Sequence, residues 1–420
     1  MNLFRLSLAY LRAQPLTAGL NVLVLALGVA TITVLLLLGR QLEDGLSRDA
    51  RGIDLVLGAK GSPIQVILSS IYHLDVPTGN ISLAAAMRWA EHPLVAEGIP
   101  LALGDSYAGF RIVGTTHAFP RHYGAELAAG RLWTREMEAV VGARVAAERG
   151  LVPGRQIIGV HGLEGSMHAH DYAPYTIVGV LAPTGGVIDR LVLTSVESVW
   201  AIHDHGHDHG HDHGHDHGHD HGHDHGHDHG HDHASDLDDH EITAMLIRFR
   251  SPLAAVTLPR LINSGPDLTA AAPAVETTRL LGFIGIGLTT VRGFGVLLIV
   301  TAGLGLFIAL YTALKTRQWD LAVMRSLGAS RARVMSHVLL EGVMLAAAGA
   351  LLGLLLGHLV AEFVGQSLRQ AGEMGITGRV FYTEELWLFA LMLAVGALAA
   401  LIPAWTAYRT DIARTLSRSR

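Results

Sequence analysis

The sequence of 420 residues contains no cysteine. The chain therefore forms no disulfide and offers no thiolate ligand to zinc or to an iron–sulfur cluster. Charged side chains are also scarce, at 16% of the residues, whereas hydrophobic residues make up 50%. This composition is too apolar for an ordinary soluble domain and predicts a membrane protein.

Four apolar stretches are long enough to cross a bilayer, which takes about 20 residues. They predict transmembrane helices over residues 17–39, 293–314, 338–360 and 386–405. Basic residues precede the first stretch, as they do in a signal peptide. Its apolar run of about 22 residues is too long for one, and no clear cleavage site follows. We therefore expect an uncleaved anchor.

Lys and Arg residues flank the predicted spans unevenly. Residues 315–337 carry five of them against one acid, and the tail 406–420 carries four more. Because cytoplasmic flanks are enriched in these residues, both segments and the amphipathic N-terminal helix 1–16 are expected in the cytoplasm. The large region 40–292 and the short loop 361–385 then lie on the outer side of the membrane. If the membrane is the inner membrane of a bacterium, as we expect, this side is the periplasm.

The predicted spans contain almost no ionisable residue. Glu341 and His358 lie near the two ends of the third span, where an interfacial position is expected. Gly349, Gly353 and Gly357 recur in that span at four-residue spacing. Small residues at this spacing let helices approach closely. The row therefore predicts a packing seam, either inside the chain or between two copies.

The residue pattern of the outer region differs from that of the spans, because short β-rich runs alternate with Gly and Pro. Residues 109–116, 155–162, 175–183 and 190–195 predict strands. Residues 82–93 begin with a Ser cap and end at Pro, which predicts a helix. The expected fold is an α-helical membrane protein with four transmembrane helices and an inserted α+β periplasmic domain.

A low-complexity tract of His-Asp-His-Gly units interrupts the outer region. Between His203 and His240 the sequence has eleven Asp and no Lys, Arg or Glu, which outweighs the net charge of −6. With Gly at every fourth position and no apolar residue in the repeat, the tract cannot bury a core, so we expect a disordered loop over 203–240.

Imidazole is a common zinc ligand, and four ligands complete a tetrahedral site, so two units of the tract supply one. We expect several weak sites for zinc or another divalent metal, because copper and nickel also suit imidazole. A solubilising or pH-responsive linker is the alternative interpretation. The candidate ligands are His203, His205, His207, His209, His211, His213, His215, His217, His219, His221, His223, His225, His227, His229, His231 and His233.

The segment "LKTRQWDLAVMRSLGASRARV" (314–334) resembles the cytoplasmic coupling motif of FtsX/MacB-like ABC transporter permeases, a family that includes lipoprotein-release and macrolide-exporter types. In that motif a helix precedes a Leu-Gly-Ala-Ser turn. Here Asp320 and Leu321 replace the more usual Glu-Ile. The order "IVGTT…ELAAGRLW…AVVGARVAAERGLVPG…YTIVGVL" is similar to the family's periplasmic core domain. The candidate ATPase-coupling residues are Arg317, Asp320, Leu321, Arg325, Leu327, Gly328, Ala329 and Ser330.

The resemblance implies a permease subunit rather than an enzyme. A separate cytoplasmic ABC ATPase would hydrolyse ATP, and the permease would transmit the movement to its periplasmic domain. The chain has no G-x-x-x-x-G-K-[ST] loop, so ATP acts only through that partner. A homodimer in membrane lipid is expected, with no catalytic cofactor and no nucleic acid. The tract adds an expected link to zinc homeostasis and to a periplasmic or outer-membrane metal-related protein.

Two other functions compete with this one. The first is an FtsX-like transmembrane signalling protein that regulates an envelope enzyme. The second is an ion-coupled metal transporter with the histidine tract as collector, and the lack of ionisable groups at the midplane counts against it. The sequence leaves the substrate and the direction of transport open.

Overall fold

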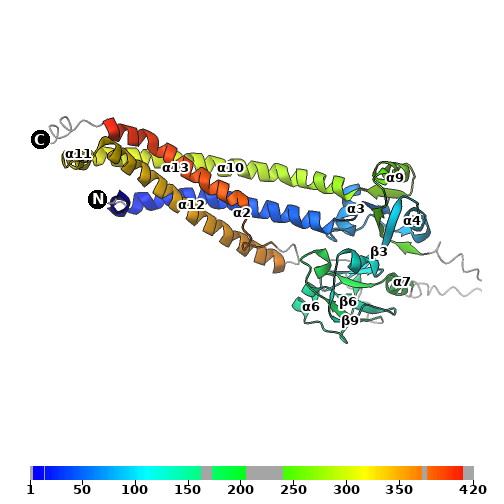
Figure 1. Ribbon diagram of the computed structural model, residues 1–420. Helices are drawn as coiled ribbons and strands as arrows, with labels where there is room; N and C mark the ends of the chain where they lie inside the picture. Colours follow the sequence, from blue (N-terminus) through cyan, green and yellow to red (C-terminus); the bar gives the residue numbers. More distant parts are fainter. Residues whose placement is uncertain (1–2, 14, 162–172, 205–239, 371–375, 410–420) are drawn as a thin grey trace, which may run out of the picture. The chain divides into compact units, whose positions relative to one another are not determined.

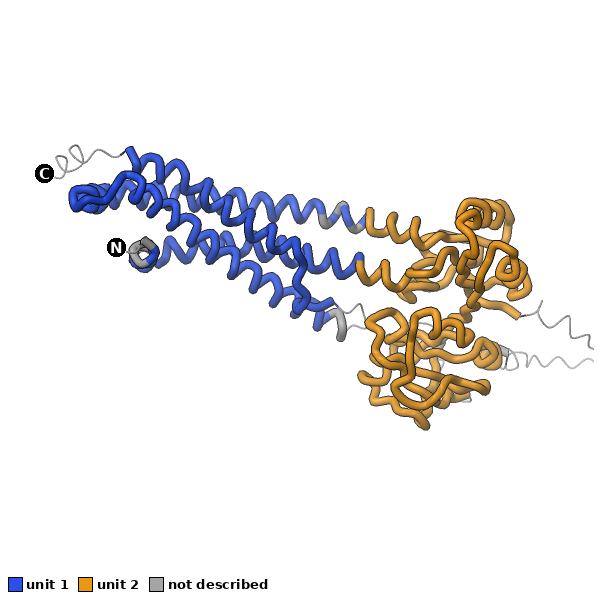
Figure 2. Tube along the Cα trace, viewed as in Figure 1, with its two compact units in different colours: residues 1–43, 283–420 blue, residues 44–282 orange. Residues whose placement is uncertain are grey.

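The computed structural model describes residues 3–13, 15–161, 173–204, 240–370 and 376–409 (Figure 1). The chain divides into two compact units (Figure 2). Unit 1 contains residues 1–43 and 283–420, and unit 2 contains residues 44–282. Unit 2 is thus inserted between the first and second apolar helices of unit 1.

Unit 1 is built from helices. Four helices of the described chain are long and apolar enough to cross a membrane, in agreement with the expected fold. They pack through buried leucine, isoleucine, valine, methionine and alanine side chains. The helices are α1 (Leu3–Ala13), α2 (Pro15–Asp49), α10 (Pro273–Thr316), α11 (Gln318–Ser326), α12 (Arg331–Gln370) and α13 (Thr383–Arg409).

The helices continue beyond the predicted spans. Residues 40–49 and 273–292, which were expected in the outer α+β domain, are the ends of α2 and α10. Likewise, α12 continues to Gln370 and α13 begins at Thr383, inside the segment expected as a loop. The physical reason is that a helix satisfies its backbone hydrogen bonds in water as well as in lipid, so polarity marks the end of an apolar run and not the end of the helix.

Unit 2 has a mixed sheet with strand order β13-β1-β12-β3-β4-β10-β6-β9-β5, with β7 beside β9 and β8 beside β3. Strands β4 and β10 are parallel, as are β6 and β9. The separate strands β2 and β11 form a second, two-stranded sheet. The strands are β1 (Leu55–Ala59), β2 (Ile81–Ser82), β3 (Val95–Tyr107), β4 (Phe110–Thr115), β5 (Leu127–Gly130), β6 (Glu138–Val141), β7 (Gln156–Ile157), β8 (Val160–His161), β9 (Tyr175–Leu181), β10 (Val192–Ser195), β11 (Glu241–Ile242), β12 (Ala244–Phe249) and β13 (Leu268–Ala271).

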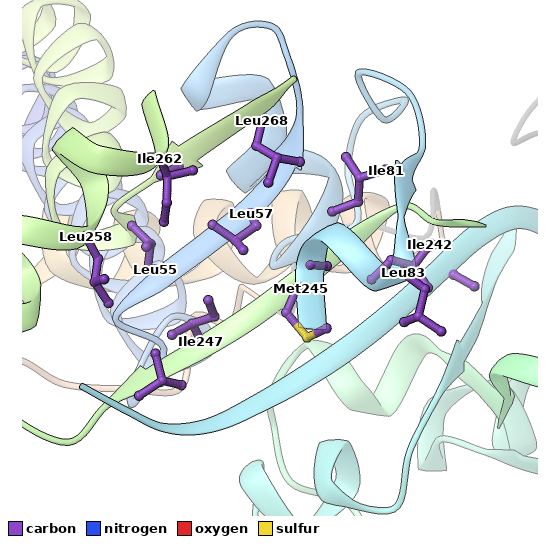
Figure 3. Close-up of a cluster of buried hydrophobic side chains, with 14 of the residues drawn as sticks. Leu55, Leu57, Ile81, Leu83, Ile242, Met245, Ile247, Leu258, Ile262 and Leu268 are labelled. Atoms are coloured by element: carbon purple, nitrogen blue, oxygen red, sulfur yellow. The ribbon is translucent and has the colours of Figure 1, made fainter. Parts of the chain in front are cut away.

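Short helices cover this sheet and bury its apolar face. In one hydrophobic cluster Leu57 and Met245 of the sheet pack with Leu258 and Ile262 of α9 (Figure 3). A second cluster lies around β6, β9, β10 and α6. The inserted α+β domain is therefore confirmed. Its helices are α3 (Pro63–Ser70), α4 (Leu83–Ala90), α5 (Ala118–His122), α6 (Ala143–Arg149), the 3-10 turn η1 (Val187–Arg190), α7 (Val196–Asp204) and α9 (Leu253–Asn263).

Candidate functional site

The candidate coupling segment consists of helix α11 and the turn Leu327–Ser330 that follows it. The helix ends in a Schellman motif, in which Gly328 N–H donates to Arg325 O and Ala329 N–H donates to Met324 O, both at 3.1 Å. Gly328 has a φ of +99°, a left-handed conformation that glycine adopts without strain. The glycine of the turn therefore follows from the geometry that stops the helix.

The same turn starts the next helix and leaves an apolar side chain outside. Ser330 Oγ accepts a hydrogen bond from Arg333 N–H at 3.3 Å, as an N-cap residue does. Leu327 is 82% exposed and Trp319 of α11 is 54% exposed, whereas Leu321 is buried. Leu321 packs against the ends of α10, α12 and α13. The segment is thus anchored on one face and presents two large apolar side chains on another.

Arg317 connects the coupling segment to α12. It lies between α10 and α11, and its Nη1 is 3.3 Å from Oε1 of Glu341. Both side chains are largely buried. A buried charge pair of this kind is strongly destabilised when one partner is removed. Arg317 therefore holds the bend between α10 and α11 in place, while Asp320 and Arg325 are half-buried on α11.

A buried polar contact fixes the N-terminal helix to the same region. Ser7 Oγ of α1 lies 2.8 Å from Nδ1 of His337 on α12. The two residues are separated by 330 positions. No local sequence pattern indicates this contact, and neither residue was among the candidates.

The glycine row of the third span faces α2 of the same chain. A Cβ atom on Gly349, Gly353 or Gly357 would lie 2.5–2.6 Å from the Cβ atoms of the α2 residues opposite. Real Cβ atoms do not approach so closely, so the row allows α12 and α2 to pack backbone to backbone. The α2 residues opposite are Leu25, Val29 and Thr33.

The histidine tract lies outside the described residues, except that His203 belongs to α7. Its two flanks meet at Trp200. The rings of Trp200 and His240 are 4.1 Å apart, and Trp200 Nε1 donates to Glu241 O at 2.7 Å. Within the described ranges no three His, Cys, Asp or Glu side chains gather into a metal site. The metal ligands of the tract thus stay predictions.

One tyrosine of unit 2 joins the end of α2 to the start of α10. The Tyr72 hydroxyl lies 2.7 Å from Thr277 Oγ1 and donates to Leu46 O at 3.2 Å. Burial raises the pKa of Tyr72, so the hydroxyl keeps its proton. Its carbonyl accepts from Arg190 Nη2 at 2.7 Å. Tyr72 therefore contacts three elements: the end of α2, the start of α10 and the η1 turn. Helices α2 and α10 both continue into unit 1.

His73, the next residue, is strained and buried. Its φ is +52°, and neither ring nitrogen makes a hydrogen bond with a described residue. Burial lowers the pKa of His73 well below its usual value, and Arg111 and Arg190 lower it further, so the imidazole is neutral. Arg111 also donates to Asp75 O at 2.7 Å. Strained residues with unmet polar groups are typical of functional sites.

The last turn of α2 contacts η1 directly. Asp49 Oδ1 accepts from Val187 N–H at 2.9 Å, and Arg48 Nη1 donates to Gly185 O at 2.5 Å. We call Leu46, Asp49, Tyr72, His73, Arg111, Arg190 and Thr277 the outer joint. Its contacts connect residues up to 205 positions apart, so no local sequence pattern predicts them.

Comparison with known proteins finds matches in both units of the chain. The FtsX-like permease C-terminal model matches residues 292–412, and the MacB-like periplasmic core domain model matches residues 18–214. The lipoprotein-releasing system transmembrane protein LolE of Haemophilus influenzae is 32% identical over 136 residues. Over these ranges the chain is similar to ABC transporter permeases of the FtsX/MacB type.

The match to LolE covers 29% of this chain and 33% of LolE, so the chain spans about a third of the length of this curated relative. Among solved structures, the periplasmic region of MacB from Actinobacillus actinomycetemcomitans is 10% identical with a TM-score of 0.33, and the match covers 56% of this chain and 97% of that chain. The extracellular domain of the noncanonic ABC-type transporter YknZ from Gram-positive bacteria is 11% identical with a TM-score of 0.29, covering 51% and 98%. At these TM-scores neither structure adds to the fold described above.

The two family matches fall on different parts of the chain. The FtsX-like match contains the coupling segment and the glycine row. The MacB-like match contains most of the outer joint and ends within the tract. With its four apolar helices and its MacB-like match, the chain is a membrane protein with a periplasmic domain.

Proposed function

We propose that this permease is the membrane subunit of an ABC complex in the bacterial inner membrane. A separate ATPase hydrolyses ATP in the cytoplasm, and the permease transmits the movement to its periplasmic domain. The observation that carries the proposal is the exposure of Trp319 and Leu327 on a segment that Leu321 and Arg317 hold in place. Large apolar side chains exposed on a rigid polar segment are typical of a docking surface.

A continuous set of contacts and helices connects the coupling segment to the outer joint, and it supports the same function. A force on α11 acts on α10, α12 and α13 through the cluster around Leu321 and through the Arg317–Glu341 pair. Helices α10 and α2 are continuous up to Thr277 and Asp49, where the outer joint begins. Continuous helices are stiff elements, so a tilt at one end reaches the other.

In this proposal, the permease acts on its substrate at the outer side of the membrane. The name of LolE refers to the release of lipoproteins, and we extend to this permease only the class of action, the handling of an envelope substrate outside the bilayer. We further propose that the histidine tract binds zinc or a similar divalent ion, with the ions held reversibly by imidazole nitrogens. That binding would link the permease to zinc homeostasis and to a periplasmic or outer-membrane metal-related partner.

The docking surface provides the test. Leu327→Asp should abolish co-purification with the ATPase subunit, because it places a charge in an apolar contact. Leu253→Asp is the matched control, since Leu253 is an equally apolar, exposed residue on α9 of unit 2, and this variant should keep the ATPase. Equal binding by both variants, or ATP hydrolysis by the permease alone, would contradict the proposal.

The regulation of an envelope enzyme by an FtsX-like signalling protein remains the second candidate, because the FtsX-like match covers the coupling segment. Both functions use the same segment and the same ATPase. A gene for a cell-wall hydrolase beside this one favours signalling, whereas a gene for a metal-binding envelope protein favours transport.

A further inference from the structure

A buried histidine of the third span contacts both α13 and residues 376–382, which we call the linker because they precede α13. His358 of α12 is 9% exposed, and Glu385 in the first turn of α13 is 2% exposed. His358 Nδ1 lies 2.6 Å from Gly378 O of the linker, and its Nε2 lies 2.8 Å from Glu385 Oε2. One imidazole ring therefore connects α12 to the linker and to the start of α13.

The linker lies at the end of the helix bundle from which the chain enters unit 2. Gln41 of α2 holds it there, because its Oε1 accepts from Thr377 N–H at 2.9 Å and its Nε2 donates to Thr377 O at 2.8 Å. Unit 2 begins three residues after Gln41, and the MacB-like periplasmic core match continues from there to residue 214. His358 and the linker therefore lie at the periplasmic end of the bundle.

The contacts of His358 require one proton more than a neutral histidine and an ionised glutamate carry together. A neutral imidazole has one N–H donor and one acceptor nitrogen. Both nitrogens of His358 face oxygen atoms, and neither Gly378 O nor an ionised carboxylate can donate. The contact with Glu385 forms only if the imidazole is doubly protonated or the carboxyl group is protonated. In either form one proton lies between Nε2 and Oε2.

The acidic group next to His358 on α12 has donors of its own. Glu362 accepts from Thr377 Oγ1 at 2.8 Å and from Gly378 N–H at 2.9 Å, and its Oε1 lies 3.7 Å from Arg379 Nη2. A Cβ atom on Gly378 would clash with His358 O, so the linker packs directly on the backbone of α12. Glu362 therefore fixes the linker beside His358 without using the imidazole.

The charged groups of α2 and α13 near this pair are also engaged with each other. Glu384 Oε1 accepts from Arg40 Nη2, and Arg40 Nη1 lies 3.7 Å from Glu43 Oε2. Among the described side chains, His358 is the basic group within ion-pair distance of Glu385. The proton between Nε2 and Oε2 is therefore the positive charge that compensates this buried carboxylate.

We propose that His358 and Glu385 form a proton-binding site, which clamps α12 to the linker and to α13 while it holds its proton. Loss of the proton leaves an acceptor nitrogen facing a buried carboxylate without a partner, an arrangement that strongly disfavours the closed clamp. None of these contacts involves the coupling segment, so the proposal stands apart from the proposed function.

The sign of the pH dependence follows from the proton count. When the clamp opens, water reaches His358, and a solvated histidine releases its proton above a pKa of about 6.5. Opening therefore releases a proton above this pH, and its equilibrium constant should rise by up to about tenfold per pH unit. An acidic periplasm keeps the outer ends of α12 and α13 together, and an alkaline one lets them separate.

Hydrogen exchange of the linker amides in the full chain, held in nanodiscs, tests this dependence. Gly378 N–H and Tyr382 N–H donate to Glu362 and Glu385, so their protection reports the closed clamp. After correction for the intrinsic effect of pH on exchange, this protection should fall by up to about tenfold per unit between about pH 6.5 and about pH 8. Corrected protection that does not change over this range would overturn the proposal.

Glu385→Gln removes the need for the extra proton. The amide keeps an oxygen for Tyr382 N–H and offers an N–H to Nε2 of a neutral His358. The clamp should stay closed in this variant and lose its pH dependence. Glu384→Gln is the matched control, because it removes the neighbouring carboxylate, which bonds Arg40, and it should keep the slope of the unmodified chain. An unchanged slope in Glu385→Gln would refute the site.

A direct observation of the proton makes the test independent of the stability of any variant. At about pH 7.5 most solvated histidine and glutamate side chains have lost their protons. The unmodified chain with ¹⁵N-labelled histidine should then still show either an imidazolium signal by NMR or a carboxylic-acid band by infrared spectroscopy. Absence of both would overturn the proposal, as would persistence of the same signal in Glu385→Gln.

Discussion

Tyr72 and Thr277 place their hydroxyl oxygens 2.7 Å apart in unit 2, although they are separated by 205 residues. The same Tyr72 oxygen bonds Leu46 O, so one side chain holds the end of α2 and the start of α10. These helices contain the first two candidate membrane spans. A change in their spacing must therefore break or stretch a hydrogen bond of Tyr72.

Thr277→Val should remove one of these bonds while keeping the shape of the side chain. We expect a loss of about 1 kcal/mol in the opening free energy of residues 71–76, measured by hydrogen exchange on the full chain. Thr278→Val is the matched control, because Thr278 Oγ1 bonds only Ala274 O of its own helix. Similar exchange in the two variants would show that Tyr72 does not depend on α10.

Below the ordinary pKa of histidine, His73 should make the stability of unit 2 depend on pH. Its pKa is lowered well below 6.5 in the folded chain, so only the unfolded chain takes up this proton as the pH falls. The free energy of unfolding of unit 2 is therefore unaffected by the titration of His73 above pH 6.5. Below this pH it declines by about 1.4 kcal/mol per pH unit until the lowered pKa of His73 is reached.

His73→Asn should flatten this slope, because asparagine tolerates a positive φ and does not titrate. Hydrogen exchange of the β1 and β4 amides between about pH 7 and about pH 5 measures the slope. An unchanged slope in the variant would assign the pH dependence to other groups.

Gly328→Ala should impair coupling by straining the turn after α11. A residue with a Cβ at φ +99° costs about 1–2 kcal/mol, so we expect weaker stimulation of the ATPase partner and a lower thermal stability of the complex. Gly293→Ala serves as control, because a Cβ there meets no atom within 4 Å. The idea fails if Gly328→Ala stimulates the ATPase as the unmodified chain does.

Gly353→Ala should separate α12 from α2. The new Cβ would lie 2.5 Å from Val29 Cβ, and overpacking of this kind costs about 1–3 kcal/mol. Gly287→Ala on α10 meets nothing within 4 Å and should leave the midpoint of thermal unfolding in detergent unchanged. Equal midpoints for the two variants would contradict the packing described for the glycine row.

Removal of residues 205–239 should abolish most zinc binding without unfolding unit 2, since the His-Asp-His-Gly repeat carries no apolar side chain that could join a core. Protons compete with metal for imidazole below a pKa of about 6.5, so calorimetry should show affinity falling from about pH 7.5 to about pH 5.5. A single tight site that ignores pH would contradict the interpretation of the tract as several exchangeable sites.

Features that depend on neighbouring residues were predictable from the sequence. The apolar spans, the strand at 175–183 and the turn at Gly328 each follow from a local pattern. Contacts between distant residues were not predictable, because no local pattern indicates that Ser7 contacts His337 or that Tyr72 contacts Thr277.

The contact between Trp200 and His240 has a consequence for the evolution of the tract. A repeat of four codons gains and loses units by slippage during replication. Because both flanks are held at Trp200, a longer or shorter repeat leaves α7 and β11 where they are. Each doubling of such a loop costs only about 0.6 kcal/mol of closure entropy. The number of His-Asp-His-Gly units is therefore free to change independently of the domain that bears them.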